Sequence, residues 1–157
     1  MIAVILAALS LHSSAFDANA QIPARFTCQG TNDTPPLTIA DVPAAAKSLA
    51  LIVDDPDAPD PAKPKRTWVH WVVYDLPAKA GELDAAAGRA GTGDAGNTGW
   101  KGPCPPIGRH RYFFKLYALS DVLPDLANPT KAQLEKAMQG HILVQAELIG
   151  TYEKKQR

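Results

Sequence analysis

Three carboxylates and two prolines stand close together directly after an apolar segment. The stretch Asp54-Asp55-Pro56-Asp57-Ala58-Pro59 follows the apolar run at 48–53. Each proline fixes its own φ and disfavours the helical conformation for the residue before it. We therefore predict a loop that leaves a strand and aims the carboxylates of Asp55 and Asp57 at a site. Asp54, still on the strand, is expected to be structural.

Two histidines precede apolar side chains on predicted strands. Successive side chains of a strand point to opposite faces, which puts positions 68, 70, 72 and 74 on one face and 110, 112, 114 and 116 on another. His70 then lies beside Trp68, and His110 lies beside Tyr112. An imidazole at the mouth of an apolar slot can hold a small polar ligand. The alternative is a pair of core histidines bonded to the backbone.

A segment rich in glycine and proline at 99–108 leads into His110. Its glycines allow backbone N–H groups to approach a ligand closely, and its prolines keep the loop from collapsing. Together with the carboxylates, the histidines and the aromatic rings, this loop predicts a pocket.

Other chemistries fit the residues less well. Asp55 or Asp57 could join His70 and His110 in a metal site of mixed oxygen and nitrogen ligands, but the spacing matches no recognised signature. No serine lies in a Gly-x-Ser-x-Gly turn, and Cys104 lies between prolines. Glycoside hydrolysis needs one carboxylic acid of raised pKa in an apolar setting, which the Asp-Pro-Asp sequence does not offer.

The elements that would position these groups are mostly strands. Segments 48–53, 68–74, 111–119 and 141–149 are apolar or rich in β-branched and aromatic residues. Thr130 and Gln133 form a capping box, Gly140 stands where a helix should end, and the residues between them predict the one clear helix. The segment 78–99 has few bulky side chains and reads as a loop. We predict an all-β fold, a Greek-key-like β-sandwich of antiparallel sheets with one or two short helices.

Length and charge narrow the function. A chain of 157 residues fits a single domain over 1–157, and its Lys plus Arg total of 16 equals its Asp plus Glu total. The largest basic cluster, at 63–66, is short and interrupted by proline, whereas nucleic acid binding needs a basic face. We expect no cofactor and no nucleic acid partner.

The N-terminus has two interpretations. Residues 1–9 resemble the apolar core of a signal peptide, and 18–20 have the form of a cleavage site. However, Lys and Arg are absent before Arg25, and the apolar run is shorter than the ~20 residues of a membrane-spanning helix. We therefore predict a first strand here and a cytoplasmic rather than periplasmic protein.

The two cysteines, Cys28 and Cys104, are too far apart in sequence to form a Cys-x-x-Cys pair of a structural zinc site. They form either one disulfide, which would indicate an oxidising compartment, or two small buried apolar residues. Sequence spacing leaves both interpretations open.

Three of these segments, taken in order, resemble one known family. They are 55–59 (Asp-Pro-Asp-Ala-Pro), 68–70 (Trp-Val-His) and 102–112 (Gly-Pro-Cys-Pro-Pro-x-Gly-x-His-Arg-Tyr). The chain is similar over nearly its whole length to the phosphatidylethanolamine-binding proteins, in particular the bacterial and archaeal branch often labelled Raf kinase inhibitor-like.

The resemblance implies a small pocket for phosphate, phosphorylethanolamine or a similar anion in a non-enzymatic binding protein. Matching positions imply the ligand-binding residues Asp55, Asp57, Pro59, Trp68, His70, Gly102, Pro103, His110 and Tyr112. It also implies weak contact with phospholipid headgroups, a kinase or serine protease as partner, and favours the Cys28–Cys104 disulfide. Gly93, Ala95 and Trp100 depart from the family pattern and suggest a looser pocket rim. Exposed strand edges make a homodimer reasonable.

Asp55 and Asp57 would repel a phosphate, so we expect them to act on the histidines. A carboxylate that accepts from one imidazole nitrogen leaves the other nitrogen to donate to the anion, which predicts tighter binding as the pH falls through ~6.5. A ligand ammonium group would give the acidic stretch a direct partner. The competing hypotheses are a metal-dependent hydrolase and an inhibitor that acts through surface loops.

Overall fold

The computed structural model describes residues 7–156. In chain order the elements are β1 (Ser10–His12), the 3-10 turn η1 (Ala24–Phe26), β2 (Thr38–Ala40), β3 (Ser48–Ala58), β4 (Arg66–Leu76), β5 (Gly81–Glu82), the 3-10 turn η2 (Ala85–Ala87), β6 (Arg89–Ala90), β7 (Arg109–Leu119), α1 (Lys131–Met138) and β8 (Ile142–Glu153).

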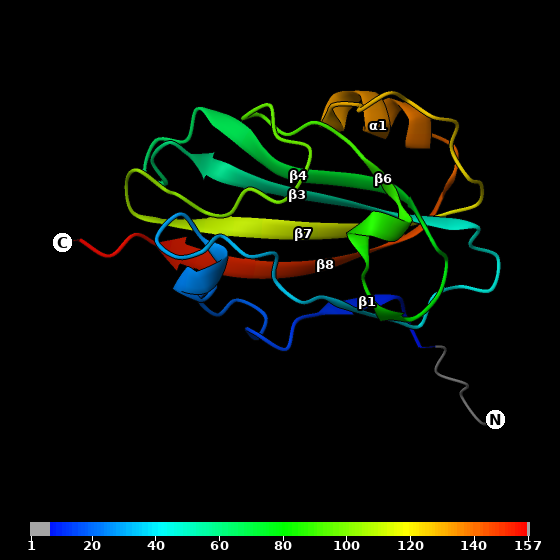
Figure 1. Cartoon of the computed structure of the whole chain (residues 1–157), viewed down its shortest axis with the longest axis horizontal. Helices are drawn as coiled ribbons and strands as arrows, with labels where there is room; N and C mark the ends of the chain where they lie inside the picture. The colour runs from blue at the N-terminus through cyan, green and yellow to red at the C-terminus, as the bar shows by residue number, and fades with distance from the viewer. Residues whose placement is uncertain (1–6, 157) are drawn as a thin grey trace.

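Two antiparallel sheets form the fold. The larger has five strands in the order β6-β4-β3-β7-β8, and the smaller has three in the order β1-β2-β5. The small sheet lies on one face of the large sheet and α1 lies on the other (Figure 1). The expected antiparallel sandwich with a short helix is confirmed.

The central strand β3 separates two apolar cores. Leu49, Leu51 and Val53 pack in the core shared with the small sheet, whereas Ala50 and Ile52 pack in the core under α1. A strand that is covered on both faces needs apolar residues at every position, which explains the unbroken apolar run at 48–53. The same alternation determines where the carboxylates after this run point.

The acidic stretch is not a loop, and this prediction is wrong. β3 continues to Ala58, pairing Asp55 with Trp68 and Ala58 with Arg66, and the register is interrupted between these two pairs. Pro56 lies within that interruption, where a strand does not need its N–H for the ladder. The carboxylates therefore sit on a rigid strand.

A second irregularity reorients His70. Val53 pairs with Trp71 and Asp54 pairs with Val69, so His70 is the extra residue of a bulge in β4. The simple alternation predicted for positions 68 to 74 is wrong because bulges turn a side chain out of the regular pattern. Positions 72 and 74 pack under α1, while His70 lines a pocket on the other side. The row at 112, 114 and 116 does share one core.

The helix begins as the sequence predicts. The Thr130 side chain accepts from the N–H of Gln133, and the Gln133 side chain accepts from the N–H of Thr130. Gly140 follows the helix with a φ of +80°. Asp54 projects to this side of β3, where Lys131 of α1 and Lys115 of β7 reach its carboxylate at 2.7 and 3.0 Å. Asp54 thus ties α1 to the sheet and is structural.

The predicted first strand falls largely on residues 1–6, which lie outside the described residues. Residues 7–9 have no regular structure, and the first strand, β1, begins at Ser10. The segment 78–99, expected to be a loop, contributes the short strands β5 and β6. Within 7–156 we find no helix with the length and apolar character that a bilayer crossing requires.

Cys28 and Cys104 form a disulfide that joins the segment after η1 to the glycine-proline segment. The N–H of Cys28 also donates to the carbonyl of Pro103 at 3.1 Å. Of the two interpretations of these cysteines, the structure bears out the disulfide.

Candidate functional site

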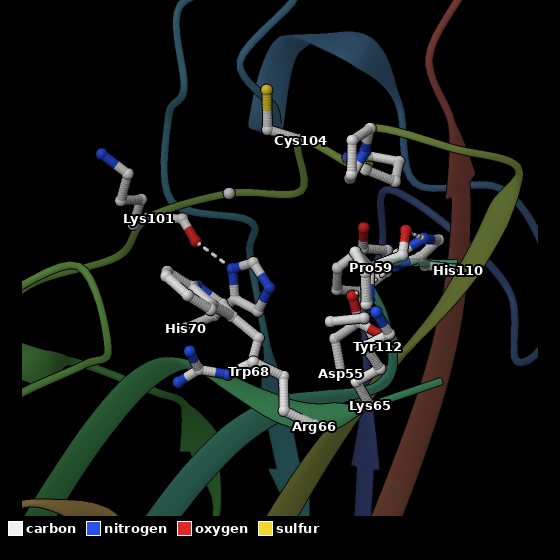
Figure 2. A pocket seen from close by; sticks show the side chains of 14 residues that line it. Asp55, Pro59, Lys65, Arg66, Trp68, His70, Lys101, Cys104, His110 and Tyr112 are labelled. Carbon is white, nitrogen blue, oxygen red and sulfur yellow. Dashed lines mark hydrogen bonds and ion pairs between the residues drawn. The ribbon is translucent and has the colours of Figure 1, made fainter. Parts of the chain in front are cut away.

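A pocket of about 440 Å³ opens at the end of the large sheet where β3, β4 and β7 meet the glycine-proline segment (Figure 2). It is lined by Asp55, Ala58, Pro59, Lys65, Arg66, Trp68, His70, Lys101, Gly102, Cys104, Pro105, Pro106, His110 and Tyr112. Of the residues predicted from sequence, all but Asp57 and Pro103 border this pocket. Distant segments of the chain therefore converge as the motifs suggested.

Asp55 and His110 form a buried pair at one wall. Nδ1 of His110 lies 2.6 Å from Oδ2 of Asp55, and the two side chains are only 1% and 5% exposed. Nε2 of His110 lies 2.9 Å from the carbonyl of Ile107 and 3.1 Å from that of Pro59. Carbonyl oxygens only accept, so Nε2 must carry a hydrogen.

The pair therefore shares one further proton between Nδ1 and Oδ2. Whether that proton resides on the histidine or on the aspartate, Asp55 and His110 together have no net charge. The expected repulsion of an anion by Asp55 is removed in this way. The expected N–H from His110 to the ligand is absent, however, because both nitrogens already bind protein oxygens.

His70 is held differently from the prediction. Its Nδ1 lies 2.7 Å from the carbonyl oxygen of Lys101 and not beside a carboxylate. That carbonyl fixes a hydrogen on Nδ1, which leaves Nε2 as the nitrogen that faces the pocket (Figure 2). Burial lowers the pKa of His70, opposed by the Lys101 hydrogen bond and the nearby Asp55, and so favours the neutral ring.

The hydroxyl of Tyr112 is buried and has no hydrogen-bond partner within the described part of the chain. Tyr112 lines the pocket, and its ring meets the His70 ring edge-on at a centroid separation of 5.2 Å. Burial raises the pKa of this phenol, so it keeps its proton and can donate. Buried polar groups are rarely left without a partner, so this hydroxyl has unused hydrogen-bonding capacity.

Asp57 does not act on a histidine, and this expectation is wrong. Its two oxygens accept from the N–H, Nε and Nη2 groups of Arg111 at 2.8 to 3.0 Å. The hydrogen bonds to Arg111 lower the pKa of Asp57, so the carboxylate stays ionised. Asp57 lies in the stretch between Asp55 and Ala58 where the regular strand pairing is interrupted.

Gly102 is required for packing and not for access of a ligand to its N–H. That N–H donates to Oδ1 of Asn32 at 2.9 Å, and a Cβ on Gly102 would overlap the carbonyl oxygen of Phe26. Pro103 lies behind the wall, where its carbonyl accepts from Cys28. The sequence departures Gly93, Ala95 and Trp100 do not line the pocket, so they do not loosen its rim.

Sequence reasoning missed the cations of the rim. Arg66 stacks over the Trp68 ring at 4.6 Å from its centroid, and Lys65 precedes it in the chain. In the sequence, the cluster at 63–66 bears only on nucleic acid binding. The signal that could have found these cations is their position in the sequence, with only Thr67 between Arg66 and the Trp68-Val-His70 motif.

The bulge that presents His70 also depends on residues that sequence reasoning passed over. The side chain of Asp94 accepts from the N–H of Val69 at 2.8 Å, and the side chain of Asn97 donates to the carbonyl of His70 at 2.8 Å. These bonds satisfy backbone groups that the irregular pairing leaves open.

The ligand set of the metal hypothesis does not assemble. Asp57 binds Arg111, and both nitrogens of His110 bind protein oxygens. Among residues 7–156, His, Cys, Asp and Glu side chains nowhere gather in a group of three or more that could hold an ion.

Comparison with known proteins identifies a family and relatives for this chain. The family model "Phosphatidylethanolamine-binding protein" matches residues 12–153. A UPF0098 protein of Chlamydia pneumoniae is 49% identical over 149 residues, which cover 93% of this chain and 99% of the relative. A UPF0098 protein of the archaeon Methanothermobacter thermautotrophicus is 44% identical over 155 residues, with 93% and 99% covered.

Solved structures show the same fold. A phosphatidylethanolamine-binding protein homologue from Chlamydia trachomatis superposes with a TM-score of 0.87 at 46% identity, covering 94% of this chain and 99% of the other. Escherichia coli YbcL, described as a member of the mammalian family, gives 0.83 at 30% identity, with 95% and 100% covered. The chain belongs to the phosphatidylethanolamine-binding protein family.

Proposed function

We propose that this protein is a non-enzymatic binding protein whose pocket takes a small phosphate-bearing ligand of the phosphorylethanolamine type. The observation that carries the proposal is the charge arrangement around the pocket. Asp55 is neutralised by its shared proton with His110, while Lys65 and Arg66 stand at the rim. Lys101 also lines the pocket and the Asp94 carboxylate pairs with Arg66, so these groups together leave the opening with a net positive charge.

The ends of the pocket differ in character. The deep part offers the Tyr112 hydroxyl and Nε2 of His70, and the wall between is formed by proline, alanine and the Trp68 ring. A ligand of this size needs few polar anchors when apolar walls exclude water around it. This arrangement supports reversible binding, since the described residues that line the pocket include no serine, no threonine and no free thiol that a base could activate.

The test is calorimetric titration with phosphorylethanolamine at low and at physiological ionic strength. We expect measurable binding that weakens as salt is added, because exposed cations contribute to it. Arg66→Gln should weaken affinity about two- to fivefold, because Arg66 is 54% exposed and an exposed ion pair contributes up to about 1 kcal/mol.

Arg109→Gln is the matched control. Arg66 and Arg109 are 54% and 60% exposed, and each is paired with one carboxylate, but only Arg66 lines the pocket. A second matched pair is Lys65→Gln, which changes a residue that lines the pocket, and Lys63→Gln, which changes a nearby lysine that does not. Only the first of these two variants should weaken binding. Equal losses in the Arg66 and Arg109 variants, or no heat of binding with the wild type, would refute the proposal.

A further inference from the structure

We propose that the Cys28–Cys104 disulfide is a thiol-reducible switch that holds one wall of the pocket closed. The wall is the glycine-proline segment 99–108, and the disulfide joins it to the residues after η1. With the bond intact the segment stays in place, and when a dithiol reduces the bond the segment moves away and the pocket opens. The inference goes beyond the proposed function, since the movement of the wall can be measured without a ligand.

The glycine-proline segment forms much of the pocket and orients both histidines. The carbonyl of Lys101 lies 2.7 Å from Nδ1 of His70. The carbonyl of Ile107 lies 2.9 Å from Nε2 of His110. The residues of the segment that line the pocket are Lys101, Gly102, Cys104, Pro105 and Pro106. A displacement of the segment therefore changes both the shape of the pocket and the orientation of the two rings.

The backbone of this segment makes few hydrogen bonds. No helix or strand of the described chain includes residues 99–108. Within residues 7–156, their one backbone–backbone hydrogen bond runs from the N–H of Cys28 to the carbonyl of Pro103 at 3.1 Å. Segments with few backbone hydrogen bonds open locally at a low free-energy cost. The position of the segment therefore depends on its other links.

Those links all lead to residues 26–32. Nε1 of Trp100 donates to the carbonyl of Phe26 at 3.1 Å, and the N–H of Gly102 donates to Oδ1 of Asn32 at 2.9 Å. Beyond residue 103, the disulfide is the only covalent or hydrogen-bonded link that the described chain shows between residues 104–108 and residues 26–32. Breaking it leaves this part of the wall without an anchor to the residues after η1.

The disulfide lies where a reductant can reach it. Both cysteines are exposed. The sulfur of Cys104 points away from the rings of His70 and His110, so it faces the outer side of the wall (Figure 2). Exposed disulfides are more readily reduced by thiols than buried structural ones. A reductant can therefore attack this bond without entering the pocket.

Reduction by a dithiol transfers two electrons to the protein. One thiolate of the dithiol attacks a cysteine sulfur, and a new S–S bond forms as the Cys28–Cys104 bond breaks. The released cysteine thiolate takes up a proton. The second thiolate of the dithiol then attacks its own sulfur in the mixed disulfide, so the other cysteine leaves and is protonated. The dithiol ends as a cyclic disulfide, oxidised by two electrons.

Limited proteolysis with trypsin measures the state of the wall. Cleavage between Lys101 and Gly102 requires that this carbonyl leaves His70 and that this N–H leaves Asn32. Lys79, exposed in the connection between β4 and β5, is the internal reference. Dithiothreitol should free both thiols without denaturant. After removal of the reductant without oxygen, cleavage at Lys101 relative to Lys79 should be about tenfold faster or more, because cleavage follows the population of the open segment.

Three results would overturn the inference. The first is an unchanged cleavage ratio in the fully reduced protein, since the hydrogen bonds alone would then keep the wall closed. The second is an equal acceleration at Lys115, inside β7, since the disulfide would then stabilise the whole fold and not the wall. The third is a disulfide that dithiothreitol reduces only after denaturation. As a control, Cys28→Ser with Cys104→Ser should be cleaved like the reduced protein, with or without dithiothreitol.

The effect on a ligand rests on the proposed function. If the reduced wall is closed in about a tenth to a third of the molecules, phosphorylethanolamine should bind about three- to tenfold more weakly to the reduced protein. By linkage, saturating phosphorylethanolamine makes the disulfide harder to reduce by the same factor, and tenfold corresponds to about 30 mV for a two-electron couple. Equal affinities of the two forms would contradict the switch. If neither form binds phosphorylethanolamine, the proposed function fails, and the trypsin experiment still decides whether reduction opens the wall.

Discussion

The buried Asp55–His110 pair gives the most specific prediction about stability. His110→Gln can place its amide N–H near the position of Nε2, where it still reaches the carbonyls of Pro59 and Ile107, but it removes Nδ1. Asp55 then loses the ionisable partner that the structure gives it within residues 7–156, while it remains buried. Breaking a buried pair by removing one partner costs about 3–5 kcal/mol of unfolding free energy.

The reverse substitution should cost less. In Asp55→Asn the side-chain amide donates to Nδ1 of a neutral His110, and Oδ1 still accepts from the N–H of Asp57. One hydrogen bond is kept without charge, so we expect a loss of about 1 kcal/mol. The double variant, Asp55→Asn with His110→Gln, should be more stable than the sum of the single losses predicts, by about 1.5–3 kcal/mol.

Urea denaturation at pH 7 of the wild type, the two single variants and the double variant measures these terms. Domains of this size have unfolding free energies of about 5–15 kcal/mol, so the weakest variant should remain measurable. His110→Gln should also weaken phosphorylethanolamine binding more than Asp55→Asn does, because only the former leaves a bare carboxylate at the pocket wall. A coupling energy under about 0.5 kcal/mol, or equal effects of the two variants on binding, would refute the shared-proton account.

Further predictions concern stability and pH. The disulfide closes a long loop, with Cys28 and Cys104 separated by 76 positions, so Cys28→Ser with Cys104→Ser should lower the unfolding free energy by about 4–5 kcal/mol in urea denaturation. The hydrogen bonds to Arg111 lower the pKa of Asp57. The ionised carboxylate therefore adds to the unfolding free energy above pH ~4, and this contribution is lost as the pH falls further. The difference in unfolding free energy between wild type and Asp57→Asn should be about 1–3 kcal/mol at pH 6 and should close toward pH 2. Burial lowers the pKa of His70 below 6.5, so as the pH falls the unfolded chain protonates this histidine before the folded chain does. The stability of the ligand-free protein should therefore be full above pH 6.5 and decrease below it. In thermal denaturation at pH 5 to 7, His70→Asn should make this decrease of stability with falling pH smaller.

The strands and the helix were predictable because their signals are local. Apolar and β-branched runs mark β3, β4, β7 and β8, and one capping box marks the start of α1. The errors arose where a strand departs from regular pairing. Pro56 looked like the start of a loop, yet it occupies a place in β3 where the ladder is interrupted, which only the partner strand determines.

The candidate site shows the same division. The motifs predict that Trp68, His70, His110 and Tyr112 border one pocket, and the structure has all four in its lining. This was predictable because residues at matching strand ends meet when the strands pair. The partners of the polar groups were not predictable, since they depend on contacts over long sequence separations. The Lys101 carbonyl beside His70 and the Arg111 side chain beside Asp57 replaced the carboxylate–imidazole contacts that we expected.

The central claim is that the pocket holds a phosphate group between His70 and Tyr112, in front of a neutral Asp55–His110 pair. A crystal structure with phosphorylethanolamine at saturating concentration tests it most directly. The account predicts phosphate oxygens within ~2.6–3.0 Å of Nε2 of His70 and of the Tyr112 hydroxyl, with Nδ1 of His110 still on Asp55. An empty pocket, or a ligand whose ammonium group faces His70 while its phosphate lies elsewhere, would contradict it.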